Sequence, residues 1–121
     1  MNWRLEFHHQ FHHEFDEFSG EVQDNILSKS LLIQRFGPHL GRPHVDTLKG
    51  SKHPNMKELR LDVEKGVWRI AFAFDPERKA ILLVAGDKAG KSKKRFYKSF
   101  ISKADKRFDE QLENLKSKKE K

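Results

Sequence analysis

The residues best suited to chemistry are basic and aromatic side chains in the second half of the chain. They are Lys49, Lys52 and His53 in a Gly- and Pro-rich stretch, Lys57, Glu58, Arg60 and Arg69 in two alternating segments, and Lys88, Arg95 and Tyr97 beyond them. Lys and Arg can bind an RNA phosphate, and the 2′-OH beside that phosphate is an internal nucleophile. Its reaction needs a proton acceptor, cations that neutralise the added charge, and a proton donor for the leaving oxygen. These residue types can supply all three without a metal ion.

Packing and solubility offer a second interpretation of the same residues. The two strand Arg residues could form salt bridges with a nearby carboxylate, Glu58 or Asp62. The only Tyr of the chain could pack beside Phe96, and the basic run before it, residues 93–95, could be the solvated start of a helix. The residue types alone leave both interpretations open.

Four His near the N-terminus form a separate candidate site. His8 and His12, and likewise His9 and His13, are four residues apart, a spacing that presents two imidazoles to one metal ion on a helix. A nearby Glu, Glu14 or Glu17, could supply a third ligand. The segment straddles a strand-to-helix junction, which does not assure this geometry. The sequence therefore favours a solvated polar face, with no metal and no cofactor.

Several other chemistries are excluded or disfavoured by missing residues. The chain has no Cys, which excludes disulfides and thiolate metal sites. It has no Gly-x-Ser-x-Gly motif of a serine nucleophile. The stretch Gly86-Asp-Lys-Ala-Gly90-Lys-Ser92 is one residue shorter than the spacing of a phosphate-binding P-loop, so nucleoside triphosphate binding is not expected.

Four segments are predicted to be strands. Residues 56–63 alternate, with Lys57, Leu59, Leu61 and Val63 on one face and Glu58, Arg60 and Asp62 on the other. In residues 67–74 the large apolar side chains share one face, so Arg69 lies on the opposite face with two Ala. Residues 80–86 are apolar on both faces, as in a central strand, and residues 2–7 form an edge or first strand. Arg60, Arg69 and Glu58 therefore share a polar side, joined by Asp87 and Lys88.

Helical periodicity predicts the remaining elements. Apolar residues spaced three or four apart indicate helices over 11–18 and 20–36, with a bend at Ser19-Gly20. Residues 37–55 contain three Gly and three Pro before the sheet and are expected to be a loop. A last helix begins after Ser92, with a stripe formed by Phe96, Phe100, Ala104, Phe108, Leu112 and Leu115. The result is an α+β fold, a single domain over residues 1–115, with residues 116–121 as a basic frayed tail.

Charge is distributed unevenly along the 121 residues, whose net charge is +7. Residues 1–27 contain six acidic residues and one base, whereas residues 88–107 contain nine bases and one acid. This asymmetry favours a polyanionic partner on the C-terminal side. The basic candidates for RNA and ribosome binding there are Lys88, Lys91, Lys93, Lys94 and Arg95, together with Lys49, Lys52 and His53 in the loop. No apolar run of membrane-spanning length and no signal peptide is present, so a cytoplasmic protein without a membrane partner is expected.

Several segments together resemble the RelE/HigB toxins, in the phage-derived branch of that superfamily. They are Leu40-Gly-Arg-Pro-His-Val-Asp-Thr-Leu-Lys-Gly-Ser-Lys-His53, Met56-Lys-Glu-Leu-Arg60, Trp68-Arg-Ile-Ala-Phe-Ala-Phe-Asp-Pro76, Ala80-Ile-Leu-Leu-Val84, Gly86-Asp-Lys88 and Arg95-Phe-Tyr97. The resemblance implies a compact RelE-like domain, in which a small, mostly antiparallel sheet packs against N-terminal helices and a C-terminal helix. It also implies a type II toxin that cuts mRNA on the ribosome, as an endoribonuclease without a metal ion, and so inhibits translation.

The resemblance further implies partners and site residues. The partners are a cognate helix-turn-helix antitoxin and mRNA on the ribosome, with operator DNA bound only through the antitoxin complex. The family's loop Lys match Lys49 and Lys52, and its strand Arg match Arg60 and Arg69. The catalytic set is then Arg60, Arg69, Tyr97 and Lys57, although Asp87 and Lys88 stand where some relatives carry a His. The alternatives are a non-catalytic nucleic-acid-binding module and an antitoxin-binding protein that has lost its activity.

Overall fold

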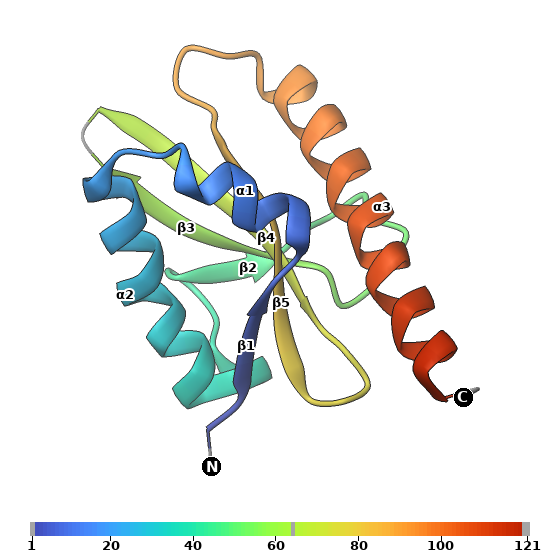
Figure 1. The fold of residues 1–121 in the computed structure, drawn as a ribbon. Coiled ribbons are helices and arrows are strands. Elements are labelled where there is room, and N and C mark those ends of the chain that lie inside the picture. The colour runs from blue at the N-terminus through green and yellow to red at the C-terminus, as the bar shows by residue number, and fades with distance from the viewer. Residues whose placement is uncertain (1, 64, 120–121) are drawn as a thin grey trace.

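A five-stranded sheet with helices on both faces organises the molecule (Figure 1). The computed structural model describes residues 2–63 and 65–119. The elements are β1 (Arg4–Phe7), α1 (His9–Asp16), α2 (Gly20–Phe36), a 3-10 turn (Gly37–His39), β2 (Val45–Thr47), β3 (Lys57–Val63), β4 (Gly66–Phe74), β5 (Lys79–Asp87) and α3 (Lys93–Lys119). The strand order is β1-β5-β4-β3-β2, and among the described strands only β1 pairs in parallel. The α+β class and the mostly antiparallel sheet are therefore confirmed.

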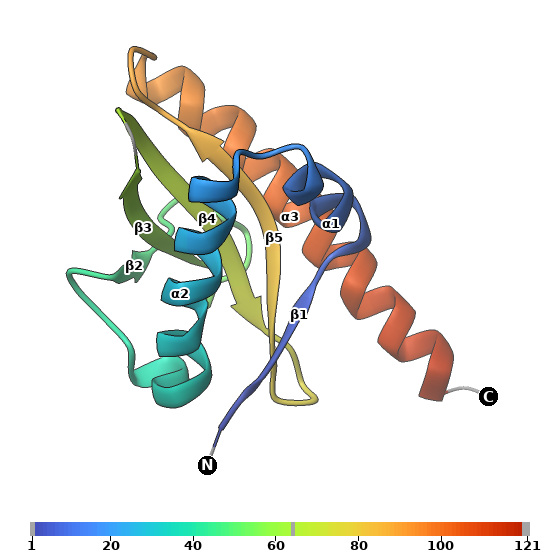
Figure 2. The ribbon, with the colours of Figure 1, turned by 60° about the vertical axis from the view of Figure 1, so that its left-hand side comes forward.

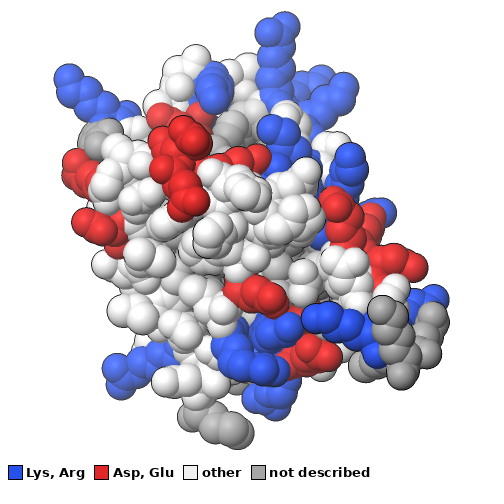
Figure 3. Space-filling model, in the orientation of Figure 1, with Lys and Arg blue, Asp and Glu red and all other residues white. Residues whose placement is uncertain are grey.

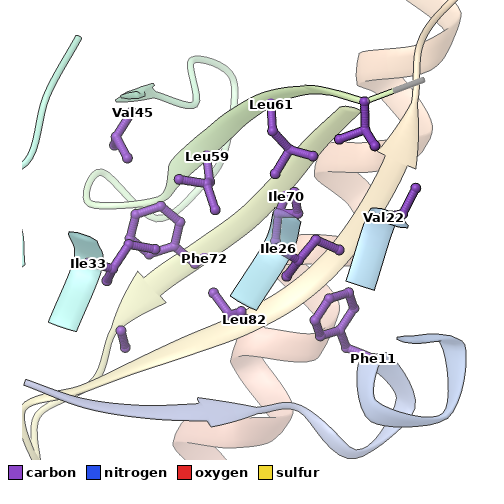
Figure 4. Packing of buried hydrophobic residues seen from close by; sticks show 12 residues of the cluster. Phe11, Val22, Ile26, Ile33, Val45, Leu59, Leu61, Ile70, Phe72 and Leu82 are labelled. Atoms are coloured by element: carbon purple, nitrogen blue, oxygen red, sulfur yellow. The ribbon is translucent and has the colours of Figure 1, made fainter. Parts of the chain in front are cut away.

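The helices form two layers separated by the sheet. In Figures 1 and 2, α2 covers one face of the sheet and α3 crosses the other, while α1 lies at the β5 side and reaches α3 through the Glu14–Arg107 ion pair. The apolar residues of α1 and α2 pack with Leu59, Ile70, Phe72 and Leu82 of the strands (Figure 4). On the opposite face, α3 packs on a second set that includes Ala71, Ala73, Ile81 and Leu83. The strand β5 contributes to both sets, as its apolar sequence predicts for a central strand.

Alternation along β4 places Arg69 on the α3 side of the sheet. The large side chains Ile70 and Phe72 belong to the core under α2, whereas Ala71 and Ala73 belong to the core under α3. Successive strand residues point to opposite faces, so Arg69 shares the face of the two Ala. Small residues on this face leave room for a helix to pack close to the sheet.

The N-terminal helices follow the predicted periodicity with shifted ends. The first helix spans His9–Asp16 rather than 11–18, and α2 begins and ends where predicted. The hydroxyl of Ser19 accepts a hydrogen bond from the Val22 amide at 3.3 Å, so it caps α2 and ends the chain reversal. Phe36 ends the predicted stripe but is exposed.

Residues 37–55 are not entirely loop. They include the 3-10 turn and β2, whose three residues pair antiparallel with Lys57–Leu59. A three-residue edge strand is too short to show alternation in the sequence, which is why it was not predicted.

The C-terminal helix begins as predicted and is longer than predicted. The Ser92 hydroxyl accepts a hydrogen bond from the Arg95 amide, and Phe96, Phe100, Ala104, Phe108 and Leu115 are buried. The helix continues to Lys119, so residues 116–119 are helical instead of frayed, and residues 120–121 lie outside the described residues. Within the described part of the chain, no helix is both long enough and apolar enough to span a membrane.

Candidate active site

Arg60 and Arg69 lie directly opposite each other on β3 and β4. Directly paired residues in an antiparallel sheet share a face, so both Arg residues lie on the α3 side. Glu58 is two residues before Arg60 and pairs with Ala71, which places it on the same face. The predicted grouping of Glu58, Arg60 and Arg69 is therefore what strand register produces.

Tyr97 of α3 joins this group by a hydrogen bond. Its hydroxyl donates to Oε1 of Glu58 at 2.8 Å, and the Glu58 residue is 4% exposed. The other carboxylate oxygen, Oε2, accepts from Nε and Nη2 of Arg60 at 3.2 and 3.1 Å. Arg60 also donates to Oδ2 of Asp46 on β2 at 3.2 Å. A buried carboxylate is thus held between a phenol and a guanidinium.

Two further cations border the Glu58–Tyr97 pair. Lys88, just after β5, places its Nζ 5.6 Å from the centre of the Tyr97 ring. Burial and the nearby charge of Arg69 lower the pKa of Lys88. Burial, together with the hydrogen bond to Glu58, raises the pKa of Tyr97, while Arg69 acts in the opposite direction. The phenol is therefore protonated at neutral pH, and the Lys88 ammonium releases its proton more readily than an ordinary Lys.

In the described structure, Arg69 interacts with the Tyr97 hydroxyl and keeps one buried donor without a partner. Its Nη1 donates to the carbonyl of Trp68 at 2.9 Å, and its buried Nε has no hydrogen-bond partner among the described residues. A guanidinium can donate five hydrogen bonds in a planar fork that matches a phosphate. The unpaired Nε–H of Arg69 therefore suits an anion that approaches the Glu58–Tyr97 pair.

The structural alternatives apply in part. Arg60 forms the salt bridge with Glu58, and adds one with Asp46 that the sequence did not suggest. Tyr97 does pack on Phe96, with ring centres 5.1 Å apart, in addition to its hydrogen bond. Sequence reasoning did not assign a catalytic role to Glu58. The sequence signal for such a role was an acidic residue within a strand that is otherwise rich in apolar residues.

Two of the predicted loop residues lie elsewhere. Lys52 forms an ion pair with Asp109 of α3, and Nε2 of His53 lies 2.8 Å from the same carboxylate. Asp109 is twelve positions after Tyr97, which is about 18 Å along a helix. Lys52 and His53 therefore fasten the loop to α3 at a distance from the Glu58–Tyr97 pair, and Lys49 is exposed nearby.

The described structure shows no hydrogen bond or ion pair between Glu58 and Lys57 or the basic residues before α3. Lys57 pairs with Phe72, so strand register directs it to the opposite face from Glu58. The other cations are exposed along the β5–α3 connection and the first turn of α3: Lys91, Lys93, Lys94 and Arg95. Figure 3 shows Lys and Arg side chains gathered there, at the top of the view. Lys91 and Arg95 also line a pocket of about 540 Å³ beside β5.

The His-rich segment is not the uniformly solvated face that the sequence favoured. His8 caps α1 and is 3% exposed, so the expectation of a solvated face is wrong for this residue. Burial and the neighbouring His9 ring lower the pKa of His8. His12 and His13 are exposed, and Glu14 is paired with Arg107. The potential metal ligands that come together are instead His8, His9 and Glu110 of α3.

The fold and the site define a small α+β protein in which a buried carboxylate is bonded to a phenol and bordered by cations. The sequence model of the family described as "Phage derived protein Gp49-like (DUF891)" matches residues 13–109. The chain is 51% identical over 81 residues to the putative toxin HigB3 of Mycobacterium tuberculosis, an alignment that covers 67% of this chain and 68% of that protein. The chain belongs to the Gp49-like family and shares a family with HigB3.

A second relative is longer than this chain. The putative toxin HigB2 of Mycobacterium tuberculosis is 42% identical over 102 residues, which cover 84% of this chain and 50% of HigB2. The chain therefore spans half the length of that relative.

Solved structures with the same fold are RelE toxins. A double mutant of E. coli RelE in the free state superposes with a TM-score of 0.57 at 14% identity, covering 85% of this chain and 97% of RelE. The archaeal RelE-RelB complex from Pyrococcus horikoshii gives a TM-score of 0.53 at 14% identity, covering 74% of this chain and 99% of the matched one. At this identity the likeness establishes the fold, and the RelE-like fold expected from the sequence is confirmed.

Proposed function

We propose that the protein is the toxin of a type II toxin-antitoxin system and cleaves mRNA on the ribosome. The observation that carries the proposal is the buried Glu58 carboxylate, bonded to Tyr97 and bordered by Arg60, Arg69 and Lys88. A carboxylate, a phenol and three cations on one face supply the groups that RNA transesterification requires. Membership in a family of toxins supports the same activity.

In the proposed reaction the 2′ oxygen attacks the adjacent phosphorus and the bond to the 5′ oxygen breaks. Glu58 accepts the 2′-OH proton, and Tyr97 positions that carboxylate through its hydrogen bond. Arg69 and Arg60 donate to the phosphate oxygens as negative charge builds up. Lys88, whose pKa is lowered, donates a proton to the leaving 5′ oxygen. The products are a 2′,3′-cyclic phosphate and a 5′-OH.

Cleavage of a defined mRNA tests this proposal directly. The purified protein is incubated with ribosomes stalled on the mRNA and, separately, with the mRNA alone, and the new ends are mapped. We expect cuts only in the ribosome-bound message, and none where the nucleotide at the cut carries 2′-deoxyribose. Intact transcripts and unchanged growth on induced expression of a folded protein would contradict the proposal.

A non-catalytic nucleic-acid-binding role is the second candidate. The observation that favours it is the pairing of Arg60 with Glu58 and Asp46, which uses much of its charge within the chain. Binding of RNA with no cleavage, weakened equally by Lys91→Ala and by Arg69→Ala, would support this role over the enzymatic one.

We also propose that a helix-turn-helix antitoxin is the partner. The cationic residues around Tyr97 would attract acidic side chains, and a free endoribonuclease would harm its own cell. Co-expression with the product of the neighbouring gene tests this. A complex that survives purification is expected, whereas two proteins that stay separate at micromolar concentration would contradict it.

A further inference from the structure

Three potential metal ligands come together at the junction of α1 and α3, away from the Glu58–Tyr97 pair. One ligand atom each of His8, His9 and Glu110 lies within 4.8 Å of the other two. Glu110 is thirteen positions after Tyr97 on α3, which is about 20 Å along a helix. The two His are consecutive at the start of α1, and their ring centres are 4.3 Å apart. Two distant parts of the chain thus supply nitrogen and oxygen ligands to one point.

Two of these ligand atoms are buried without a partner. Nε2 of His8 and Oε1 of Glu110 lack a hydrogen bond to any residue that the structure describes. They are 3.9 Å apart, too far for a direct hydrogen bond. The His8 side chain is 2% exposed, so water does not readily replace the missing partner. Two unpaired ligand atoms therefore lie close enough for one bonded atom to contact both.

We propose that His8, His9 and Glu110 bind a Zn²⁺ ion through His8 Nε2, a ring nitrogen of His9 and a Glu110 oxygen. Imidazole nitrogen and carboxylate oxygen are zinc ligands, and three of them leave one tetrahedral position for water. Ligand atoms in such a site lie roughly 3.3–3.5 Å apart, because each is about 2.0–2.2 Å from the metal. The separation of 3.9 Å between His8 and Glu110 needs only a small closure. His9 is exposed, so the open position can reach solvent.

Binding at His8 Nε2 has a local cost that makes it detectable. In the metal-free chain the Gln10 amide donates to His8 Nδ1 at 3.2 Å, which assigns the ring proton to Nε2. A metal at Nε2 moves that proton to Nδ1, and the Gln10 amide then loses its acceptor. One long neutral hydrogen bond is exchanged for a metal–ligand bond, and the Gln10 amide resonance reports the exchange.

The ion would act as a clamp between α1 and α3. Arg107, one turn before Glu110, already joins these helices through a bidentate ion pair with Glu14. Because that pair neutralises the Arg107 charge, the neighbouring guanidinium does not exclude a dication. Metal binding and the Arg107–Glu14 pair would then stabilise the same helix contact from adjacent turns.

Titration of the untagged protein with ZnCl₂ tests the proposal. Calorimetry should give one ion per chain with a dissociation constant at or below the micromolar range. Melting temperature should rise with free zinc above that constant, and EDTA should reverse the rise. Substitution with Co²⁺ should give the visible absorption of a tetrahedral site, and the Gln10 amide should shift on binding.

Variants distinguish zinc binding at His8, His9 and Glu110 from nonspecific zinc binding by exposed His residues. His9→Ala and Glu110→Gln remove ligands that are not fully buried, so both variants should fold. Each should bind zinc at least about 100-fold more weakly, a larger loss than removal of a hydrogen-bond partner of a metal ligand causes. The matched control is His12→Ala/His13→Ala, which removes two exposed His of α1 and should bind as the unmodified chain does. Absence of one-to-one binding, or loss of binding in the control with retention in Glu110→Gln, would overturn the proposal. A stable chain with a bound water in place of the ion would show neither the zinc-dependent rise nor the amide shift.

Discussion

The Tyr97 hydroxyl of α3 donates a 2.8 Å hydrogen bond to Glu58 of β3, a residue that is 39 positions earlier and 4% exposed. This contact joins the C-terminal helix to the sheet at the point where the cations gather. Tyr97 therefore stabilises the folded protein and also positions the Glu58 carboxylate.

Tyr97→Phe is expected to destabilise the fold by about 1–3 kcal/mol, because it leaves a buried carboxylate oxygen without its donor. The Phe ring keeps the packing on Phe96, so the loss reflects the hydrogen bond. Urea unfolding measures it. In a Glu58→Met background, Tyr97→Phe should lower the free energy of unfolding much less. Equal losses in both backgrounds would show that the Tyr97–Glu58 hydrogen bond is not the cause.

Arg69→Ala and Arg60→Ala are expected to differ in stability while both lose activity. Arg69 faces a like charge across the strand pair, so its removal should leave the free energy of unfolding unchanged or raise it by roughly 0.2–1 kcal/mol. Arg60→Ala leaves the buried Glu58 without its cation and should cost about 1.5–3 kcal/mol, near the lower figure because Arg60 is 37% exposed.

In the cleavage assay, loss of either guanidinium should slow the reaction roughly 100- to 1000-fold, as for other donors to a developing anion. Arg35→Ala is the control, since Arg35 is exposed on α2 and lies outside the group. A stable Arg69→Ala protein that still arrests growth fully would remove this residue from the site.

Asp109→Asn should loosen the basic loop on α3, although Asp105 still accepts hydrogen bonds from Ser51 and the Lys52 amide. The Asp109 carboxylate pairs with both Lys52 and His53, and these pairs lower its pKa. We expect faster trypsin cleavage after Lys49 and Lys52, with little change in melting temperature because the Lys52–Asp109 pair is largely exposed. Glu113→Gln, on the same helix, is the control. Unchanged cleavage rates would indicate that other contacts hold the loop.

The Arg107–Glu14 ion pair should make the free energy of unfolding depend on pH at acidic pH. The Arg107 hydrogen bond lowers the pKa of Glu14 below its ordinary value of 4.5. A carboxyl whose pKa is depressed by folding contributes stability above 4.5, and that contribution is lost as the pH falls through the lower folded value. Arg107→Ala should therefore cost more at about pH 6 than at about pH 3.

Urea unfolding at both pH values measures this difference. Lys106→Ala, a neighbouring exposed cation, should show no such dependence. Part of the Arg107→Ala cost should remain at the lower pH, because Arg107 also donates to the Leu83 carbonyl at 2.8 Å. An Arg107→Ala loss that is equal at both pH values would mean that only the carbonyl contact matters.

Local periodicity determined much of the fold and part of the candidate site. Side chains alternate with period two along a strand, so the pattern of β3 and β4 was enough to place Arg60 and Arg69 together opposite the large apolar residues. The same reasoning predicted β5 as a central strand and the buried stripe of α3. This reasoning could not predict the three-residue β2, because three residues are too few to show an alternating pattern.

Only the tertiary structure decided which side chains of α3 meet which partners. Tyr97 donates a hydrogen bond to Glu58, and Glu110 lies beside His8. Asp109 contacts His53, which is 56 positions earlier in the chain. A helical stripe specifies the face that packs, but not the direction in which the helix crosses the sheet or the strand residue under each turn. That crossing follows from how the small residues Ala71 and Ala73 and the apolar side chains of α3 interdigitate, and this packing is a property of the whole chain.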